Sequence, residues 1–358
     1  MPAPIETITD WHDSRIDEII DVRSPAEFAD DHIPGAINLP VFSNDERAYI
    51  GTLYKQKSPF IARREGAALL SANVANHIQQ TLLDRPENWR PLVHCWRGGQ
   101  RSRAFAHICG EIGWASFLLT GGYKTYRTKV LSQIDIIPSA LRFIIIAGAT
   151  GTGKTHLLHA LGRAGAQILD LEGLAAHKGS LLGALPHQKQ PSQRYFESCL
   201  YQAMSQFDAQ KAIFIEAESS RVCNISLPKA LWHKMAHAPK IELETNMKTR
   251  LTLLKDDYKH LMRPDQPDLQ KLISGMTARH GYETTQFWQD CLQSEDYDSF
   301  IRQLLQDHYD PAYQRASLRH DREPLGQIQL KGPKMADFDL CATQILTQLA
   351  DRATRHIR

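Results

Sequence analysis

The sequence has no apolar stretch that could cross a membrane and no targeting segment at its start. A membrane-spanning helix needs about 20 consecutive apolar residues, and no run among the 358 residues approaches that length. The first residues, Met1-Pro-Ala-Pro-Ile-Glu6, lack the basic segment and following apolar stretch of a secretory signal. We therefore expect a soluble protein that does not associate with membranes.

Paired cysteines are also missing. The six cysteines are scattered along the chain, with no CxxC pair and no spacing typical of metal ligands. This distribution argues against a disulfide framework and a zinc site, and it favours the reducing environment of the cytoplasm. The six are Cys95, Cys109, Cys199, Cys223, Cys291 and Cys341.

Neither sign of charge is in large excess, since the formal net charge is +2. This balance excludes nucleic-acid binding by a globally basic surface and leaves only local basic patches. Internal repeats and low-complexity tracts are absent as well. The composition, 42% hydrophobic and 23% charged, is that of globular proteins. A chain of 358 residues is longer than the usual length of a domain with a single hydrophobic core. We expect two domains and favour a monomer.

The first domain is expected at residues 5–127, where short apolar runs alternate with helical patterns. This alternation indicates a parallel α/β sheet whose functional loops follow the C-terminal ends of the strands. The expected strands are 16–22, 91–94 and 117–120, the expected helices are 62–81 and 101–110, and a short helix, turn and strand are expected within 26–40.

Residues 128–140 are the expected linker, and residues 141–358 are the expected second domain. Its first apolar run, Arg142–Ala147, is rich in β-branched residues, which is typical of a central parallel strand. Further strands are expected at 167–171, 211–216 and 240–245, and the chain from about residue 248 onward is expected to be mostly helical. The fold class is thus α/β throughout, with a helical C-terminal region.

The most informative segment is Leu92-Val-His-Cys-Trp-Arg-Gly-Gly-Gln-Arg-Ser102, which brings a cysteine to the start of a glycine-containing loop. Loop amides, the beginning of a helix and the charges of Arg97 and Arg101 would all favour the thiolate form of Cys95. Such a loop can hold a persulfide, its selenium analogue or a phosphate. The other five cysteines lack such surroundings, and we interpret them as packing residues.

A second loop, Gly148-Ala-Thr-Gly-Thr-Gly-Lys-Thr155, matches the phosphate-binding pattern GxxxxGK[ST] between a strand and a helix. In that pattern the backbone amides wrap a phosphate, Lys154 neutralises it and Thr155 can hold Mg²⁺. The glycines of the loop are Gly148, Gly151 and Gly153. In proteins with this pattern, an aspartate at the end of another strand normally contacts the metal ion. This sequence offers Glu216 and Glu218 instead, as candidates for a metal contact or a base. For each of them, the alternative is an ordinary surface carboxylate.

Further motifs complete a resemblance to known families. Residues 21–28, residues 32–40, the Cys95 loop and Gly121-Gly122-Tyr123 are similar to a rhodanese domain. A rhodanese-like domain followed by a P-loop NTPase-like domain resembles the bacterial tRNA 2-selenouridine synthases. The resemblance also includes residues 170–180, Gln190-Pro-Ser-Gln193 with Phe196-Glu197, and residues 216–221. Two departures are Lys178, where an arginine is expected, and Ala217, where an acidic residue is expected.

This resemblance implies an enzyme that acts on 2-thiouridine at the wobble position (U34) of tRNAs for Lys, Glu and Gln. Geranyl diphosphate would first alkylate the sulfur, and selenium from selenophosphate would then replace the S-geranyl group. Cys95 would carry selenium as a selenopersulfide, with Arg97 and Arg101 stabilising the anion. The phosphate-binding loop would hold the diphosphate, with Mg²⁺ as a candidate companion and no tightly bound cofactor. A selenophosphate-supplying enzyme is a candidate partner, and His177, Lys178 and Arg221 are candidate substrate contacts.

Three other readings remain open at this stage. One is not enzymatic: a rhodanese-type scaffold attached to a nucleotide-sensing switch. Cys95 to Arg101 also has the Cys-x5-Arg spacing of cysteine phosphatases, and a generic tRNA sulfurtransferase with a nucleotide-binding domain uses the same motifs. RNA contacts are predicted only in outline, as basic residues and aromatic side chains able to stack on a base. The aromatic candidates are Trp96, Tyr123, Tyr126, Tyr309 and Tyr313. The basic candidates form small groups: Arg63 and Arg64; Lys124, Arg127 and Lys129; Arg250 and Lys255; Arg315, Arg319 and Arg322; and Arg352, Arg355 and Arg358.

Overall fold

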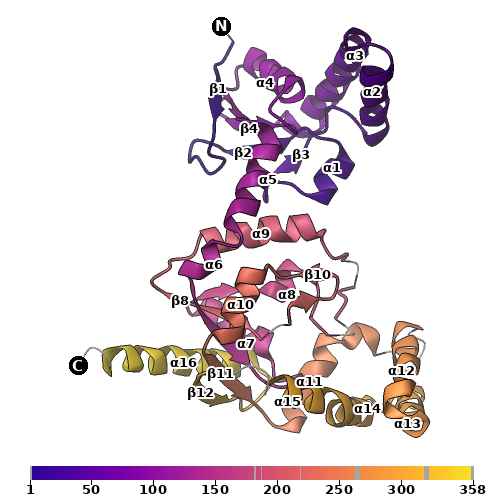
Figure 1. The fold of residues 1–358 in the computed structure, drawn as a ribbon, viewed down its shortest axis with the longest axis vertical. Helices are drawn as coiled ribbons and strands as arrows, with labels where there is room; N and C mark the ends of the chain where they lie inside the picture. Colours follow the sequence, from indigo (N-terminus) through magenta and orange to yellow (C-terminus); the bar gives the residue numbers. More distant parts are fainter. Residues whose placement is uncertain are drawn as a thin grey trace. The chain divides into compact units, whose positions relative to one another are not determined.

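The computed structural model describes residues 2–180, 183–186, 188–217, 219–262, 267–317 and 322–355 (Figure 1). The chain divides into two compact units. The first contains Met1–Ile134 together with Pro191–Gln202, and the second contains Asp135–Gln190 and Ala203–Arg358. Within the described residues, no helix combines the length and apolarity that crossing a membrane requires.

The first unit is built on a five-stranded parallel sheet, which confirms the predicted α/β class. Its strand order is β1-β5-β4-β2-β3. The central strand β4 consists of four buried residues, Pro91–His94, at the predicted position. The other strands are β1 (Ile5–Ile8), β2 (Glu18–Asp21), β3 (Ile37–Asn38) and β5 (Ser116–Leu119). The sequence did not predict β1, because three of its four residues are exposed and carry no alternating pattern.

Helices cover the sheet and extend beyond it. The helices of this part are α1 (Pro25–Asp30), α2 (Asn44–Gln56), α3 (Pro59–His77, continued by a π-helical turn at Ile78–Leu82), α4 (Gln100–Ile112) and α5 (Gly122–Gln133). Figure 1 shows α2 and α3 side by side as a helical hairpin. Ser43 and Glu46 form a capping box at the start of α2. The sequence did not predict α2, which buries no residue fully.

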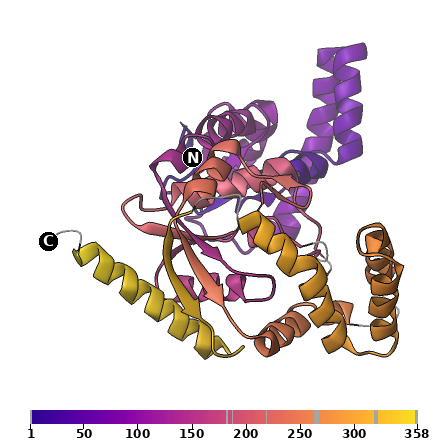
Figure 2. The ribbon, with the colours of Figure 1, turned by 60° about the horizontal axis from the view of Figure 1, so that its bottom comes forward.

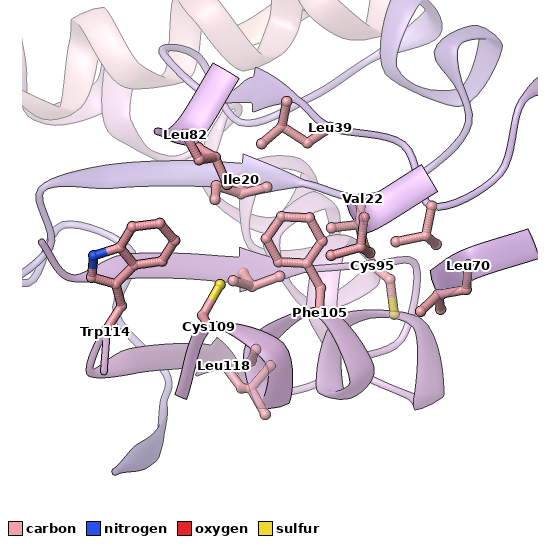
Figure 3. Packing of buried hydrophobic residues seen from close by; sticks show 14 of the residues in the cluster. Ile20, Val22, Leu39, Leu70, Leu82, Cys95, Phe105, Cys109, Trp114 and Leu118 are labelled. Carbon is pink, nitrogen blue, oxygen red and sulfur yellow. The ribbon is translucent and has the colours of Figure 1, made fainter. Parts of the chain in front are cut away.

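The core of the first unit lies between the sheet and its helices. It contains Ile20, Val93, Phe105 and Leu118, and Cys95 belongs to the same buried cluster. Figure 3 shows Cys95 at one end of this cluster, close to Leu70 of α3. The reactive loop therefore begins inside the core.

A buried ion pair fixes the end of β2. Arg23, with 1% of its surface exposed, donates through Nε to both carboxylate oxygens of Asp21 at 3.0 and 2.9 Å. Its guanidinium also donates to the Asp31 carbonyl at 2.6 Å and lies 3.8 Å from the ring centre of Tyr123. Burial opposes ionisation of Asp21, but His94 and Arg23 favour it, and the pKa of Asp21 falls below its ordinary value. The Asp21-Val-Arg23 motif is therefore structural.

A segment from the second half of the chain completes the first unit. Helix α9 (Gln193–Ser205) begins in residues assigned to that unit. Arg194 pairs with Asp30 at 2.7 Å, and Glu197 accepts a hydrogen bond from Arg127. Tyr195 stacks on His32 with ring centres 4.1 Å apart. His32 is thus a packing residue, and burial lowers its pKa.

The second unit contains another five-stranded parallel sheet, in the order β12-β11-β6-β8-β7. Its strands are β6 (Arg142–Ala147), β7 (Gln167–Leu169), β8 (Ala212–Glu216), β11 (Lys240–Glu244) and β12 (Pro324–Gln329). The expectation of a mostly helical chain after residue 248 missed β12. Only one residue of this edge strand, Ile328, is buried, so its sequence carries little strand pattern.

The helices around this sheet are α6 (Ile137–Ala140), α7 (Lys154–Arg163), α8 (Leu171–Leu174), α10 (Lys229–His237) and the C-terminal α16 (Met335–Arg355). Figure 2 shows α16, in yellow, running beside the sheet, where it packs against α7 and β12. A short hairpin, β9 (Arg221–Val222) and β10 (Ile225–Ser226), lies between β8 and α10 in the chain.

A helical group follows β11 and has a core of its own around Trp288. It comprises α11 (Met247–Asp257), a 3₁₀ turn (Lys259–Leu261), α12 (Pro267–His280), α13 (Tyr282–Gln293), α14 (Tyr297–Leu304), a π-helical turn (Leu305–Tyr309) and α15 (Asp310–Ser317). The predicted helical region is thereby confirmed between β11 and β12.

The buried ion pair makes a stability prediction. Replacing Arg23 by alanine leaves the Asp21 carboxylate buried without its partner, which costs roughly 3–5 kcal/mol. Hydrogen–deuterium exchange of the β2 and β4 amides in the first unit measures the loss. Arg15→Ala is the matched control, because Arg15 forms an exposed ion pair with Glu6. Equal protection of these amides in Arg23→Ala and Arg15→Ala would contradict the structural role of the pair.

Candidate functional site

Cys95 lies at the end of β4, where the chain turns into α4. Its sulfur accepts hydrogen bonds from the amide of Gly99 at 3.2 Å and from the hydroxyl of Ser102 at 3.3 Å. Only 3% of the residue is exposed. Both donors belong to the first turn of α4 or its N-cap, so the helix N-terminus faces the sulfur as the sequence predicted.

These neighbours tune the acidity of the thiol. Burial raises the pKa of Cys95, but the Ser102 hydroxyl, the charge of Arg101 and the amides of Ser102 and Arg97 lower it more. The net pKa lies below the ordinary value of a cysteine. Cys109, in the same core, shows the opposite case, because burial raises its pKa to about 12. Of these two core cysteines, Cys95 is the one prepared as a nucleophile.

The turn after β5 is hydrogen-bonded to the Cys95 loop. The amide of Tyr123 donates to the Cys95 carbonyl at 2.9 Å, and the amide of Lys124 donates to the Trp96 carbonyl at 3.0 Å. Gly122 has a left-handed φ of 62°, and a methyl group there would lie 2.2 Å from the Cys95 carbonyl oxygen. Only glycine fits this position, which explains the Gly121-Gly122-Tyr123 motif.

The two arginines of the loop have different surroundings. Arg101 is largely buried, and its guanidinium lies 3.3 Å from a carboxylate oxygen of Glu27. Arg97 is exposed and lines an open basic pocket of about 550 Å³ together with Lys124 and Lys129. The structure therefore brings the charge of the partly buried Arg101 close to Cys95, whereas Arg97 offers its backbone amide to the sulfur and its charge to the surface.

The phosphate-binding loop connects β6 to α7, as its pattern predicts. Gly153 is the N-cap of α7 with a left-handed φ of 85°, and a methyl group there would lie 2.7 Å from the ring of Phe338. The Lys154 ammonium donates to the Gly148 carbonyl at 3.0 Å. The lysine thus lies over the loop, and the amides at the start of α7 have no acceptor within the helix, an arrangement that suits a phosphate group.

Arg250 connects this loop to Asp310. Its Nε donates to the Thr150 carbonyl at 2.9 Å, and its other nitrogens make a two-point pair with Asp310 at 2.9 and 2.6 Å. The side chain is buried. The prediction of Arg250 as an RNA contact is therefore wrong, because its guanidinium faces the protein interior.

Carboxylates approach the loop from two directions. Glu216 is buried at the end of β8, where it pairs in register with Ile146 of β6, two residues before Gly148. Glu172 at the start of α8 accepts a hydrogen bond from the Thr155 hydroxyl at 3.3 Å. The sequence did not single out Glu172, since nothing in its spacing relates it to Thr155. Glu218 lies outside the described residues. Among those described, no cluster of three or more metal-binding side chains occurs.

The other candidate contacts, His177, Lys178 and Arg221, differ in their surroundings. Lys178 pairs with Asp257 of α11 at 3.0 Å, so its charge is already balanced. His177 is buried, and its pKa is lowered by burial. Arg221 is exposed on β9. Of these three residues, Arg221 is the one that presents its charge to solvent in the described structure.

A partly open apolar cavity of about 50 Å³ borders the phosphate-binding loop. Thr150 lies at its edge, and its walls come from α11, α14 and the turns that follow them. The lining includes Leu254, Tyr258, Phe300, Ile301, Leu304 and Tyr309. An apolar group attached to a phosphate bound by the loop would lie in this cavity.

Several aromatic and cysteine predictions need correction. Tyr123 and Tyr126 are buried and cannot stack on a base, and the Tyr313 hydroxyl is bound to Glu242. Trp96 is 36% exposed beside the Cys95 loop and remains available for stacking. Cys223 is exposed at the β9–β10 turn, so the interpretation of all other cysteines as packing residues is wrong for this one.

Comparisons with known proteins give a family match for each of the two parts of the chain. The family model described as "tRNA 2-selenouridine synthase AAA domain" matches residues 141–332, and the rhodanese-like domain model matches residues 8–129. The protein named tRNA 2-selenouridine synthase from Nitrosomonas europaea is 35% identical over 67% of this chain, and the match spans 63% of that relative, less than two thirds of its length.

Other relatives match over a larger share. The proteins of the same name from Hydrogenovibrio crunogenus and a Sulfurovum species are 30% and 31% identical, each over 82% of this chain and 88% and 87% of their own length. Among solved structures, the N-terminal domain of a putative ATP/GTP binding protein from Clostridium difficile 630 is 31% identical. It covers 37% of this chain and 92% of its own, and its TM-score of 0.29 is too low to carry an argument.

The surroundings of Cys95 predict an unusual pH profile. Because its pKa is lowered, the thiolate forms at lower pH than in an ordinary cysteine, and alkylation by iodoacetamide should rise at correspondingly lower pH. Ser102→Ala removes one hydrogen bond to the sulfur and should shift the profile to higher pH. Peptide mass spectrometry after timed labelling measures each cysteine separately, with exposed Cys223 as the reference. A profile of Cys95 that is identical in wild type and Ser102→Ala would refute the role of this hydroxyl.

Proposed function

The chain belongs to the tRNA 2-selenouridine synthase family, and from that membership we propose that it exchanges sulfur for selenium at wobble 2-thiouridine of tRNAs for Lys, Glu and Gln. The observation that carries the proposal is the pairing of two reactive loops in one chain. One loop holds a thiol with lowered pKa, and the other has the backbone of a phosphate site. Each loop suits one of two successive steps.

In the first step, the sulfur of 2-thiouridine attacks C1 of geranyl diphosphate. The carbon–oxygen bond breaks, pyrophosphate leaves, and N3 of the base releases its proton. Lys154 and the amides at the start of α7 would stabilise the charge that develops on the leaving pyrophosphate. Arg250 contributes indirectly, by holding the Thr150 carbonyl so that the loop keeps its shape.

The cavity beside the loop supports a prenyl diphosphate rather than a nucleotide. Its lining is almost entirely carbon, whereas a nucleoside needs polar partners for its base and ribose. A cavity of about 50 Å³ accepts several methylene groups, so a ten-carbon chain would fill it and extend past Thr150. Competition between geranyl diphosphate and ATP for the protein tests this choice.

Mg²⁺ would fit this loop in the manner usual for diphosphates. The ion takes one or two protein oxygens and completes its shell with phosphate oxygens and water. Thr155 and Glu172, whose oxygens lie 3.3 Å apart, are the residues that would hold it, with Glu216 as a further carboxylate at the end of β8. The bound ion would neutralise charge on the pyrophosphate.

In the second step, selenium replaces the S-geranyl group. The net exchange balances when S-geranyl uridine, hydrogen selenophosphate and water give 2-selenouridine, geranyl thiol and phosphate. The C2–sulfur bond breaks, and a carbon–selenium bond forms. Alkylation in the first step makes this feasible, because geranyl thiolate, which is protonated to the thiol as it departs, leaves more readily than the sulfur of a thiocarbonyl.

We assign Cys95 as the selenium carrier in this step. A selenopersulfide contains a sulfur–selenium bond, so loading Cys95 removes two electrons and release of the selenium returns them. The carrier route therefore requires a thiol–disulfide couple of the cell as co-reactant, whose net consumption is zero. Ser102, Gly99 and Arg101 would stabilise the selenide anion in the position of the thiolate.

A cysteine phosphatase is the alternative with a specific test. In that reading Cys95 attacks a phosphoester and Arg101 binds its phosphate. Turnover of a fluorogenic phosphoester that is abolished by Cys95→Ser would support the phosphatase and count against selenium transfer.

Nucleoside mass spectrometry tests the two-step proposal. A strain lacking the protein is complemented with wild type, Cys95→Ala or Lys154→Ala. We expect Cys95→Ala to lose 2-selenouridine and accumulate S-geranyl-2-thiouridine, because only the second step needs the thiol. Lys154→Ala should lose both nucleosides, since it removes the charge that stabilises the leaving pyrophosphate.

The controls are an exposed residue of each type. Cys223→Ala and Lys229→Ala, which lie on the surface of the second unit, should leave both nucleosides at wild-type levels. If Cys95→Ala still produces 2-selenouridine, the assignment of Cys95 as carrier is wrong. If Lys154→Ala retains S-geranylation, the phosphate-binding loop is not the diphosphate site.

A further inference from the structure

We propose that a groove between the α2–α3 hairpin and α4 binds the geranyl chain of the S-geranylated base during selenium transfer. This inference rests on the proposed function, and it locates a site for the apolar leaving group next to Cys95. The groove lies entirely within the first unit. It is distinct from the cavity beside the phosphate-binding loop, which would hold the chain in the first step.

The groove has an apolar floor and sufficient size. Its volume is about 710 Å³, within the range of roughly 300–1,000 Å³ usual for small-molecule sites. The floor combines residues from all three helices and from the loop before α2. It includes Phe42, Ile50, Gly66, Leu70, Ala104 and Ile108. An aliphatic chain laid on this floor would exclude water from apolar surface on three sides.

Two residues connect the groove to the nucleophile. Arg101 lines the groove, and its charge also lowers the pKa of Cys95. Leu70 lines the groove from α3 and belongs to the same buried cluster as Cys95 (Figure 3). If the modified base lies at the Cys95 loop, the geranyl chain on its C2 sulfur would therefore reach the apolar groove.

The charge around the groove complements RNA. Its rim carries Arg47, Lys55, Arg63 and Arg101, and Glu27 pairs with two of these arginines. An apolar floor surrounded by cations suits an apolar chain attached to a polyanion, because the rim can contact the phosphates that flank the modified base. A helix from a protein partner would use the floor, but it would not require this surplus of positive charge.

The groove also accounts for the departure of the leaving group. Attack at C2 breaks the carbon–sulfur bond, and the sulfur leaves as geranyl thiolate, which takes a proton from water. Arg101, which lines the groove and whose charge also acts on Cys95, would stabilise the charge of the thiolate. The geranyl chain stays in the groove until the thiol dissociates.

Helix α3 offers a matched set of variants for testing the site. Ala67 and Ser71 are exposed and line the groove one turn apart, whereas Ala68 and Ala72 are exposed on the same helix and do not line it. Replacing Ala67 or Ser71 by tryptophan fills the groove without disturbing the core. Ala68→Trp and Ala72→Trp add the same bulk outside the groove.

The measurement compares two RNA probes. Anticodon stem-loops carrying S-geranyl or S-methyl 2-thiouridine are bound to full-length protein in the Cys95→Ala background, and fluorescence anisotropy gives each Kd. We expect the S-geranyl probe to bind at least about tenfold more tightly, a difference of about 1.4 kcal/mol. Ala67→Trp and Ser71→Trp should reduce this ratio to near one, and Ala68→Trp and Ala72→Trp should preserve it.

Failure of the site and failure of the proposed function are distinguishable. A preference for S-geranyl RNA that persists unchanged in Ala67→Trp and Ser71→Trp overturns the groove assignment, whatever the turnover. Equal binding of both probes by the parent protein also overturns it. Conversely, a groove-dependent preference in a protein that never converts S-geranyl RNA to 2-selenouridine would retain the site and reject the proposed function.

Discussion

The contact between the Cys95 loop and the glycine turn after β5 is the constraint on which the reactive site depends. The Cys95 carbonyl is held by the Tyr123 amide, and the absence of a side chain at Gly122 lets the two backbones meet. With its carbonyls turned toward β5 in this way, the loop can direct the Gly99 amide at the sulfur. The low pKa of the thiol thus begins with backbone geometry two elements away.

The same principle operates at the phosphate-binding loop. There a side chain takes the part that a backbone amide plays at Cys95, because Arg250 donates to the Thr150 carbonyl. Asp310 in turn fixes Arg250, so a helix near the end of the chain controls the shape of a loop 160 residues earlier. In both sites, residues that never touch a substrate determine which atoms face it. Each site also borders an apolar space, as chemistry with a prenyl group requires.

The sequence predicted the parts whose signal is local. Buried strands such as β4 and β6 show as short apolar runs, and the two loops show as fixed spacings of glycine, lysine and cysteine. What it could not predict depends on long-range contacts. Nothing near Glu172 or Arg250 in the chain reveals that they meet Thr155 and Thr150. Exposure is also nonlocal, which is why Tyr126 looked available for stacking and Cys223 looked buried.

The return of residues 191–202 to the first unit has a consequence for synthesis on the ribosome. A chain that emerges from its N-terminus usually folds one domain before the next. Here Arg127 pairs with Glu197, and Asp30 pairs with Arg194. Both partners are translated only after β6, α7 and β7 of the second unit. The first unit therefore cannot complete its folding until much of the second has been translated. Nascent intermediates of the two units coexist, and a gene fragment ending at residue 134 would encode an incomplete domain.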